Sequence, residues 1–511
     1  MRALIHNVIK NECDKHVRRH FEYLADLNDY AGRRTRREGV FFIKTIKRPP
    51  WWDIAPQFNP FKVRSSRRLR TYAATLAAKL RNRTYRPNPA MIHYVPKGDG
   101  KRRTLNIFQI PDAAISNLTF KSLLQKNVSR FSAYAYAYRE DKTPHDAVND
   151  IFNEWSKKDR IYVAEYDFSR FFDEIDHRYL WQVLDRQGFV VSPEERLVIG
   201  AFLESSACDK RAYPNGAQRR DRGIPQGTSV SLFLANVACW ELDKGLERLG
   251  VGFSRYADDT LVWSDDYGKV VRSYYWIEEC ACRMGVPLNP TKSYGISLLS
   301  RIGQSSELNP KDDVNYLGYR ISLDNISIAE KKVATIKARI SFLAYQNLLQ
   351  PLKRGIFNDK RLLSGVDLDY VTALQQIRFY LYGGLTEEKL AQYLSGKISN
   401  LNFRGVMSYY PVITDIEQLS RLDGWVRYVL RQALVLRQKL WATRGIPTLP
   451  GPSADWIHKL DSLGVVLLPT EQQFNFSIPR LTLIHRAMRL AISRKGVMAV
   501  ANPTSRYYPA G

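Results

Sequence analysis

The chain has 511 residues, and its 77 Lys and Arg against 51 Asp and Glu leave a formal net charge of +26. The length argues for two to four domains, and a hydrophobic fraction of 44% with 25% charged residues is typical of a folded soluble protein. The basic surplus favours a polyanionic partner, most simply a nucleic acid, over an acidic membrane surface or a merely basic exterior. Five scattered cysteines argue against a disulfide framework, and the lack of an apolar run of about 18 residues argues against a membrane partner, so we expect a cytoplasmic protein.

The first half of the chain mixes basic, helical and extended patterns. Residues 1–57 are basic and of mixed pattern, and a Pro- and Trp-rich stretch marks their end as a boundary. Beyond it, the pattern predicts helices and strands of ordinary length. In chain order these are an Arg-rich helix (65–87), a hairpin around a Gly-Asp-Gly turn (93–107), a helix (111–128), a β-rich strand that ends at Asp167 (160–166) and a helix (192–205).

The second half begins with a Gly- and Pro-marked loop followed by a long helix, over residues 222–250. Residues 250–266 predict a strand, a tight turn and a second strand, and a helix over 274–284 and a short strand over 294–299 follow. From about residue 330 the pattern is mostly helical and basic.

Three carboxylates stand at strand ends: Asp167 after the first strand, and Asp258 with Asp259 at the hairpin turn. Neighbouring strand residues point to opposite faces, but a tight turn relaxes this alternation, so both hairpin aspartates can approach one site. If the two strands lie side by side, Asp167 and Asp258 can hold two Mg²⁺ ions, which suit an in-line attack on phosphorus. Taken singly, each aspartate is more typical of an ordinary turn.

The surroundings of these carboxylates favour the catalytic interpretation. Lys97 and Arg103 lie on the predicted hairpin, where they can clamp a triphosphate, although alone they would form a solvated basic turn. The segment RGIPQGTSVSLFLANV places a loop before a helix, which suits a base pair and its phosphates. Alone, it would be a loop and a helix cap.

Several motifs in this order resemble those of the reverse transcriptases. They are YADD (256–259), YDFSRFFDEIDH (166–177), IPQGTSVS (224–231), PLNPTKS (287–293), VNYLGYRI (314–321) and AYAYREDKTPHDAV (135–148), with a looser likeness to the thumb of group II intron proteins over 404–434. Within that family the chain is most similar to the bacterial group of group II intron, retron and defence-associated enzymes, and most like the last. The resemblance is strong over 60–330 and looser over 330–440.

The resemblance implies an α+β fold of the right-hand polymerase type, with fingers, a palm built on an antiparallel sheet, a helical thumb and an extension at each end. The implied ranges are 1–57 (N-terminal extension), 58–160 (fingers), 161–330 (palm, with a loop and helix over 207–250), 331–445 (thumb) and 446–511 (C-terminal extension).

The resemblance also assigns site residues. Asp167, Asp258 and Asp259 are implied as catalytic metal ligands, with the Phe168 carbonyl helping to hold an ion. The implied nucleotide-binding residues are Lys97, Arg103, Phe172, Gln226, Gly227, Tyr256, Ala257 and Lys292, with Phe172 as a steric gate against ribose. The implied primer grip is Tyr316, Leu317 and Gly318. Tyr507 and Tyr508 offer a protein primer, although a plain surface pair is the simpler interpretation.

The implied activity is RNA-directed DNA synthesis with two Mg²⁺ ions, or Mn²⁺ as a substitute. The implied partners are a template RNA, most simply a cognate noncoding RNA, together with dNTPs and the DNA product; a homo-oligomer stays open. We expect a role in antiphage defence, because no endonuclease segment follows the thumb. The alternatives are an intron maturase, an RNA-dependent RNA polymerase and an RNA-binding scaffold with a vestigial site.

Two departures from the intron-type pattern stand out. Ala113 follows Asp112 where intron proteins commonly have arginine, and REDKT carries two acids where they are neutral or basic. The lack of an endonuclease segment after the thumb argues against mobility by target-site cleavage.

Overall fold

The protein is represented by a computed structural model that describes residues 1–96, 100, 102–291, 293, 295–301, 310–363, 366–443, 445, 461, 465–467 and 473–501. The chain forms two compact units, each assembled from three stretches of sequence. Unit 1 consists of Met1–Ala25, Thr45–Ala147 and Lys158–Asp312, and unit 2 of Asp26–Lys44, Val148–Lys157 and Asp313–Gly511.

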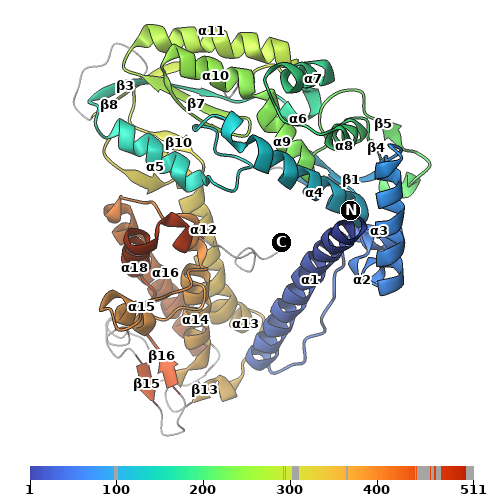
Figure 1. Ribbon diagram of the computed structural model, residues 1–511. Helices are drawn as coiled ribbons and strands as arrows, with labels where there is room; N and C mark the ends of the chain where they lie inside the picture. Colours follow the sequence, from blue (N-terminus) through green and yellow to red (C-terminus); the bar gives the residue numbers. More distant parts are fainter. Residues whose placement is uncertain are drawn as a thin grey trace. The chain divides into compact units, whose positions relative to one another are not determined.

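Unit 1 is α+β, and Figure 1 shows its helices packed around a central sheet. Its first elements are α1 (Arg2–Glu38, which continues into unit 2), α2 (Pro60–Val63), α3 (Ser66–Arg81), β1 (Ala90–Pro96), β2 (Arg102–Ile107), α4 (Ile110–Asn127), α5 (Pro144–Trp155, shared with unit 2), β3 (Arg160–Tyr166), α6 (Phe171–Glu174) and α7 (His177–Arg186). The remainder are α8 (Pro193–Leu203), β4 (Ser206–Cys208), β5 (Gln218–Arg219), α9 (Ser229–Ala238), α10 (Trp240–Leu249), β6 (Gly252–Tyr256), β7 (Asp259–Ser264), α11 (Tyr267–Met284), β8 (Ile296–Ser300) and β9 (Pro310–Lys311).

The central sheet has five strands in the order β6-β7-β3-β8-β9. β3 pairs antiparallel with both β7 and β8, so the strand after which Asp167 comes lies in the middle of the sheet. At the outer edge, the backbone of residues 134–136 hydrogen-bonds to Arg255 of β6 through Arg255 N to Tyr134 O and Tyr136 N to Arg255 O. Helices α10 and α11 pack on the sheet (Figure 1), and apolar side chains of these elements form one continuous core.

A second sheet, in the order β2-β1-β4-β5, carries the predicted basic hairpin. Its strands β1 and β2 pair from Met91 with Ile107 to Pro96 with Arg102. The hairpin is therefore confirmed, although its turn and Lys97 lie outside the described residues.

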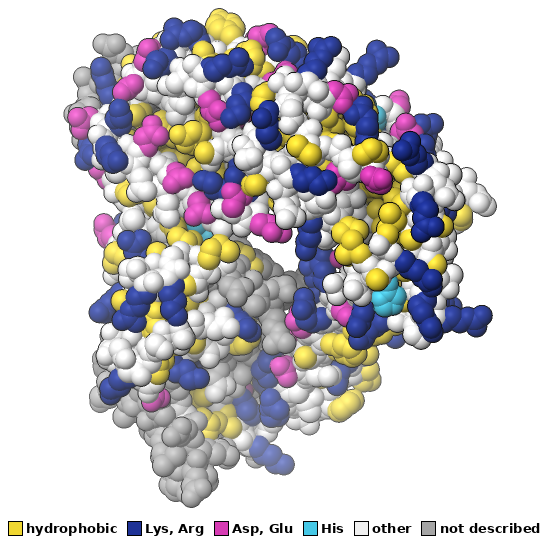
Figure 2. Space-filling model, in the orientation of Figure 1, with side chains coloured by type: hydrophobic (Ala, Val, Ile, Leu, Met, Phe, Trp, Pro, Cys, Tyr) yellow, Lys and Arg dark blue, Asp and Glu magenta, His cyan; other side chains and the backbone are white. Residues whose placement is uncertain are grey.

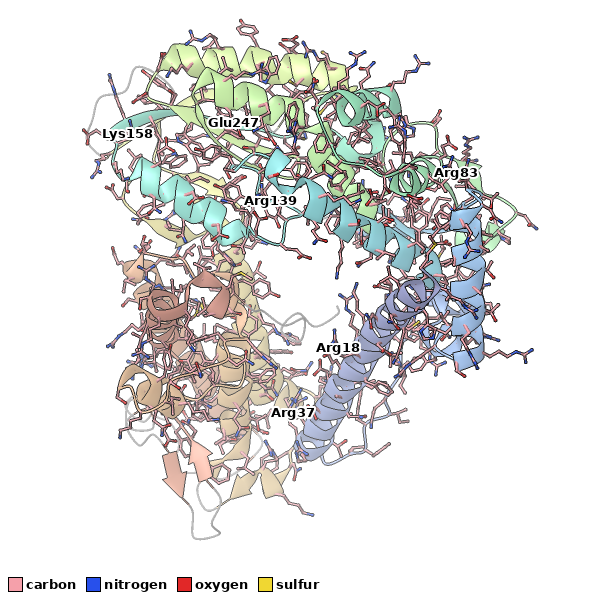
Figure 3. The ribbon with its side chains drawn as sticks, in the orientation of Figure 1. Arg18, Arg37, Arg83, Arg139, Lys158 and Glu247 are labelled. Carbon is pink, nitrogen blue, oxygen red and sulfur yellow. The ribbon has the colours of Figure 1, made fainter. Side chains whose placement is uncertain are left out.

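Unit 2 is mostly helical beyond a small three-stranded sheet. Its elements are β10 (Val314–Tyr316), β11 (Tyr319–Ile321), β12 (Ile326–Ile328), α12 (Glu330–Ala344), a π-helix (Tyr345–Leu349), α13 (Gln350–Lys353), β13 (Leu362–Leu363), β14 (Val366–Asp367), α14 (Leu368–Tyr382), α15 (Glu387–Leu394), α16 (Ile416–Ala442), β15 (Val465–Leu467), β16 (Gln473–Asn475) and α18 (Leu481–Lys495). In unit 2, the buried Arg37 of α1 donates to Asn347 at 3.0 Å, and Figure 3 labels this arginine. No helix in the described part of the chain is long and apolar enough to span a bilayer.

The predicted α+β class and the antiparallel sheet are confirmed, with β9 as a short edge strand that pairs parallel with β8. The single long helix expected within 222–250 is wrong, because the chain breaks at Cys239 into α9 and α10. The mixed pattern of residues 1–57 concealed a helix of 37 residues, α1. The segment at 404–409, expected as part of a helical region, forms a short 3-10 helix at Val406–Tyr409 instead.

Candidate active site

The Tyr-Ala-Asp-Asp segment forms a two-residue turn between β6 and β7. Tyr256 pairs with Asp259 across the hairpin, so Ala257 and Asp258 make the loop. Ala257 has a φ of 60° and is buried, with 6% of its surface exposed. Because an L-residue other than glycine is strained in this region by about 1–2 kcal/mol, surrounding contacts must hold the turn.

Asp167 arrives at the same end of the sheet. Tyr166 is paired with Thr260, so the next step along both strands sets Asp167 opposite Asp259. Asn289 fixes Asp167 twice: its side-chain Nδ2 donates to Oδ2 at 2.9 Å, and its backbone N donates to the carbonyl oxygen at 2.8 Å. Phe168, buried at 2% exposure, bridges to Leu288 in the same segment. The strand register therefore places the three predicted aspartates at one end of the sheet.

A buried ion pair lies directly behind the turn. Arg255 is fully buried and donates from Nε and Nη2 to the two carboxylate oxygens of Asp243 on α10, both at 2.7 Å. Its Nη1 donates to the Ala257 carbonyl at 2.9 Å and to Asn236 Oδ1 on α9 at 3.3 Å. Burial raises the pKa of the Asp243 carboxyl, while the adjacent guanidinium acts in the opposite direction. This contact braces the strained residue from within the core.

Arg255, Asp243 and Asn236 were missed by the sequence analysis. An arginine inside an apolar strand is the one signal that was available, because a buried cation requires a partner. Its partner, Asp243, lies on helix α10, and the sequence alone does not identify it.

Tyr138 is another neighbour of the turn that sequence reasoning missed. Burial, together with the charge of Asp258 and the proximity of Tyr256, raises its pKa to about 12, against the opposing effect of Arg103 and Arg255. The Tyr138 phenol thus stays neutral beside the charge of Asp258.

The segment that leads to Tyr138 is held by Arg139, which is labelled in Figure 3. Its guanidinium donates to Asp141 at 2.9 and 2.6 Å and to the Ser132 carbonyl at 2.6 Å. The hydrogen bond and charge of Arg139 hold the pKa of Asp141 below its ordinary value. One of the two unexpected acids is therefore neutralised within its own loop.

The Pro-Gln-Gly loop docks on β2. Arg103 Nε donates to Gln226 Oε1 at 2.9 Å, and Asn106 N donates to the Gln226 carbonyl at 2.7 Å. Gly227 has a φ of 116°, and a Cβ there would lie 2.5 Å from the Asn106 carbonyl oxygen. Only glycine allows the loop to approach β2 this closely. The hydrogen bond between Arg103 and Gln226 then joins two of the predicted nucleotide-binding residues.

Phe172 lies in the short helix α6 and is buried, with 6% exposed. Its ring meets Phe171 edge-on at 5.6 Å, and its carbonyl accepts from Ile224 N of the Pro-Gln-Gly loop at 2.7 Å. The ring is thus fixed by packing, and its role as a gate stays a prediction.

The remaining predicted site residues fall elsewhere. Tyr316, Leu317 and Gly318 form the β10–β11 hairpin of unit 2, where φ values of 51° at Leu317 and 86° at Gly318 are those of a type I′ turn. Lys97, Lys292, Tyr507 and Tyr508 lie outside the described residues.

The carboxylates suit a two-carboxylate metal site better than a closed cage. Among the described side chains, no three His, Cys, Asp or Glu residues converge as a metal-binding group. Mg²⁺ is commonly held by one or two carboxylates together with substrate phosphates, so Asp167 and Asp258 at one sheet end fit this ion.

Residues 95–321 match the family model described as "Reverse transcriptase (RNA-dependent DNA polymerase)". The matched stretch includes the hairpin turn, Asp167 and the Pro-Gln-Gly loop.

Two curated proteins are distantly similar to this chain. Protein YkfC of Escherichia coli (strain K12) is 25% identical over 185 residues, which is 35% of this chain and 46% of YkfC. The group II intron-encoded protein LtrA of Lactococcus lactis subsp. cremoris is 26% identical over 240 residues, which is 47% of this chain and 35% of LtrA. The chain thus matches less than half the length of either relative.

Among solved structures, telomerase from Candida albicans in complex with the TWJ fragment of telomeric RNA is 12% identical, with a TM-score of 0.40 over 77% of this chain and 69% of that one. Apo telomerase from Candida tropicalis, truncated from the C-terminal domain, is 12% identical with a TM-score of 0.36, over 47% of this chain and 55% of that one. Similarity at this level supports no conclusion about function.

Proposed function

We propose that this protein is an RNA-directed DNA polymerase that adds dNTPs to a primer. One observation carries the proposal: the register of β3 against β7 sets Asp167 beside the Ala257–Asp258 turn, within the stretch that matches the reverse transcriptase family. The net charge of +26 and the many Lys and Arg side chains on the face drawn in Figure 2 favour a polyanionic substrate.

In this proposal Asp167 and Asp258 hold divalent ions, with Asp259 as an acidic neighbour and the Phe168 carbonyl as a further oxygen. Mg²⁺, or Mn²⁺ in its place, supplies charge stabilisation and activates a hydroxyl when bound there. Asn289 keeps Asp167 oriented through its 2.9 Å hydrogen bond. Arg255 holds the turn that presents Asp258.

The nucleotide is positioned by residues around this turn. A 3′-hydroxyl attacks the α-phosphorus, and pyrophosphate leaves, so the work of the protein is positioning and charge stabilisation. Arg103 uses one N–H on Gln226 and carries four further donors for the β- and γ-phosphates, with Lys97 six residues earlier in sequence. Lys292 is the proposed proton donor to the leaving group, and Tyr256, Ala257 and Gly227 line the nucleotide.

The selectivity for dNTPs is assigned to Phe172, whose ring is fixed by packing against Phe171. The hairpin at Tyr316–Gly318 is the proposed primer grip, and its type I′ turn gives it a defined shape. The division into fingers, palm and thumb with two terminal extensions is part of the same proposal.

Primer extension on an RNA template tests the activity. We expect Asp258→Asn to lower the rate at least about a hundredfold, because it removes charge at the reacting centre. Asp265→Asn is the matched control: this aspartate directly follows β7, is 64% exposed and pairs with Lys158 at 2.8 Å. Equal rates for Asp258→Asn and the wild type would overturn the proposal, and preferential incorporation of NTPs would replace it with RNA synthesis.

We further propose that the template is an associated structured RNA and that the DNA serves antiphage defence, on the strength of the motif resemblance. A group II intron maturase is the second candidate, because LtrA is an intron-encoded protein. Sequencing the nucleic acids that copurify with the wild type and with Asp258→Asn separates the two. One RNA with a complementary DNA that is absent from the variant supports the first, and a flanking intron RNA without DNA supports the second.

A further inference from the structure

Unit 2 contains a cavity of about 390 Å³ between the C-terminal half of α1, helix α14 and strand β16. All described residues that line it belong to unit 2, and none lies within the 95–321 stretch. Its volume is at the small end of the range of about 300–1,000 Å³ that is usual for small-molecule sites. The cavity therefore suits one compact ligand.

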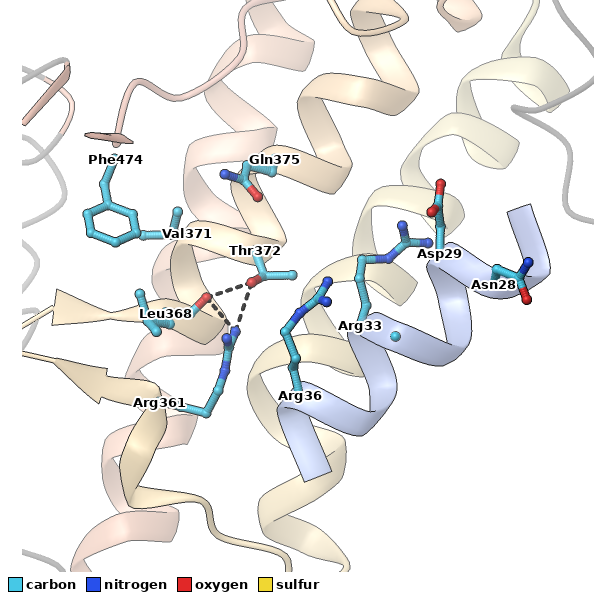
Figure 4. A pocket seen from close by; sticks show the side chains of 11 residues that line it. Asn28, Asp29, Arg33, Arg36, Arg361, Leu368, Val371, Thr372, Gln375 and Phe474 are labelled. Atoms are coloured by element: carbon cyan, nitrogen blue, oxygen red, sulfur yellow. Dashed lines mark hydrogen bonds between the residues drawn. The ribbon is translucent and has the colours of Figure 1, made fainter. Parts of the chain in front are cut away.

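One wall of the cavity is basic. Figure 4 shows Arg33 and Arg36 on α1, and Arg361 across from them. Arg361 is already satisfied, because it donates to Asp369 at 2.9 Å, to the Leu368 carbonyl at 2.8 Å and to Thr372 Oγ1 at 2.9 Å. Its donors are therefore largely used within the protein.

Arg33 and Arg36 differ from Arg361 in this respect. Within the described part of the chain, neither side chain forms an ion pair or a hydrogen bond. Burial lowers the pKa of the Arg33 guanidinium, Arg36 adds to this effect, and the nearby Asp29 and Asp26 oppose it. Asp29 is the one carboxylate among the described lining residues. One partly buried guanidinium, Arg33, and one exposed guanidinium, Arg36, thus line the cavity, with Asp29 as the one described carboxylate beside them.

Apart from Arg361, the opposite wall is apolar and amide-bearing. Val371 is buried, the Phe474 ring is half-buried, and Gln375 presents an exposed amide from α14. Paired guanidinium groups recognise phosphate oxygens, whereas an aromatic face with an amide nearby suits a planar base. The two walls therefore match the two ends of a nucleotide.

We propose that this cavity binds a single nucleotide, with its phosphate on Arg33 and Arg36 and its base against Phe474. The nucleotide is either free or one residue of a single-stranded nucleic acid, since both present the same groups. This site is separate from the proposed polymerase centre, and no carboxylate pair in it calls for a metal ion.

Calorimetric titration of the full-length protein in EDTA tests the proposal, because chelation suppresses metal-dependent nucleotide binding elsewhere. The probes are AMP, inorganic phosphate and a four-nucleotide RNA. We expect saturable binding of AMP or of the RNA, weakened at least about tenfold in Arg33→Gln/Arg36→Gln. Arg431→Gln, which removes an exposed charge from α16 of the same unit, should bind like the wild type. Binding of AMP identifies the ligand as a free nucleotide. Binding of the RNA without binding of AMP identifies it as one residue of a single strand.

Phe474→Leu tests the base contact separately: AMP or RNA should bind more weakly, with phosphate unaffected. Retention of wild-type affinity by the double arginine variant would overturn the site, as would the failure of the wild type to bind both nucleotide probes. Equal affinity of the wild type for AMP and phosphate would overturn the assignment of the base. Arg36 is exposed, so Arg36→Gln alone gives the same reading if the double variant does not fold. Primer extension by the same variants is measured in parallel. If the polymerase proposal holds and the cavity proposal does not, the variants extend the primer at the rate of the wild type.

Discussion

Replacing Asp243 with Asn tests the ion pair that lies behind the candidate catalytic turn. The side chains of Arg255 and Asp243 are each 1% exposed and meet at 2.7 Å. Removing one charge of such a pair leaves the other buried without compensation, which costs about 3–5 kcal/mol. Because domains are stable by only about 5–15 kcal/mol, the midpoint of urea unfolding should fall markedly in Asp243→Asn.

A double variant separates stability from positioning. Arg255→Met with Asp243→Leu removes both charges at similar volume, which is often nearly neutral for a buried pair. The Ala257 carbonyl then loses its 2.9 Å donor, at a cost of about 1–3 kcal/mol, and the strained turn loses its brace. Since a misplacement of about 1 Å can cost about a hundredfold in rate, we expect primer extension to be slowed about 10- to 100-fold, with RNA affinity unchanged.

Two results would refute this reasoning. Full recovery of both stability and rate in the double variant would show that Arg255 only fills space in the core and does not position the turn. Unchanged unfolding of Asp243→Asn would show that the pair is not worth the energy assigned to it. The control pair, Lys158 and Asp265, is exposed, and Asp265→Asn should change stability by only about 0–1 kcal/mol.

Three further predictions concern other residues of unit 1. Gly227→Ala should destabilise the protein by about 1–3 kcal/mol and raise the KM for dNTP, because its Cβ would lie 2.5 Å from the Asn106 carbonyl; unaltered unfolding and KM would contradict this. Phe172→Val should raise the ratio of NTP to dNTP incorporation at least about tenfold in competition assays, and an unchanged ratio would remove the gate. Burial lowers the pKa of His145 to about 4 in the folded protein. In the unfolded chain the pKa of this histidine is about 6.5, so between pH 7 and pH 5 the unfolded state binds a proton that the folded state does not. The free energy of unfolding should therefore fall by about 2 kcal/mol from pH 7 to pH 5. Thermal unfolding of the wild type and His145→Gln checks this, and the variant should have the flatter profile.

The local elements of the site follow from the sequence. Strand β3 and the β6–β7 hairpin are short, β-rich and ended by polar residues, so their existence was predictable. The prediction placed Asp258 and Asp259 in the turn, whereas the turn consists of Ala257 and Asp258, and Asp259 is the first residue of β7. The pairing of β3 with β7 was an assumption of that prediction, and the register that sets Asp167 opposite Asp259 came from the structure.

What the sequence analysis missed depends on tertiary contacts or on a weak pattern. The partner of Arg255 comes from α10, and the acceptor of Asn289 is Asp167, which follows β3 and is more than a hundred residues away in sequence. Helix α1 was detectable in principle, since its buried side chains recur every four residues. These are Ile5, Ile9, Cys13 and Val17. The many charged residues between them obscured this stripe.

The backbone bonds between residues 134–136 and Arg255 have a consequence for assembly. A strand at the border of a sheet presents unpaired amide and carbonyl groups that invite another chain to add itself. Here part of that border is already taken by the molecule's own loop, which closes with a parallel bridge at Ala135. Edge-to-edge pairing of two copies through this part of β6 is therefore opposed by the fold itself.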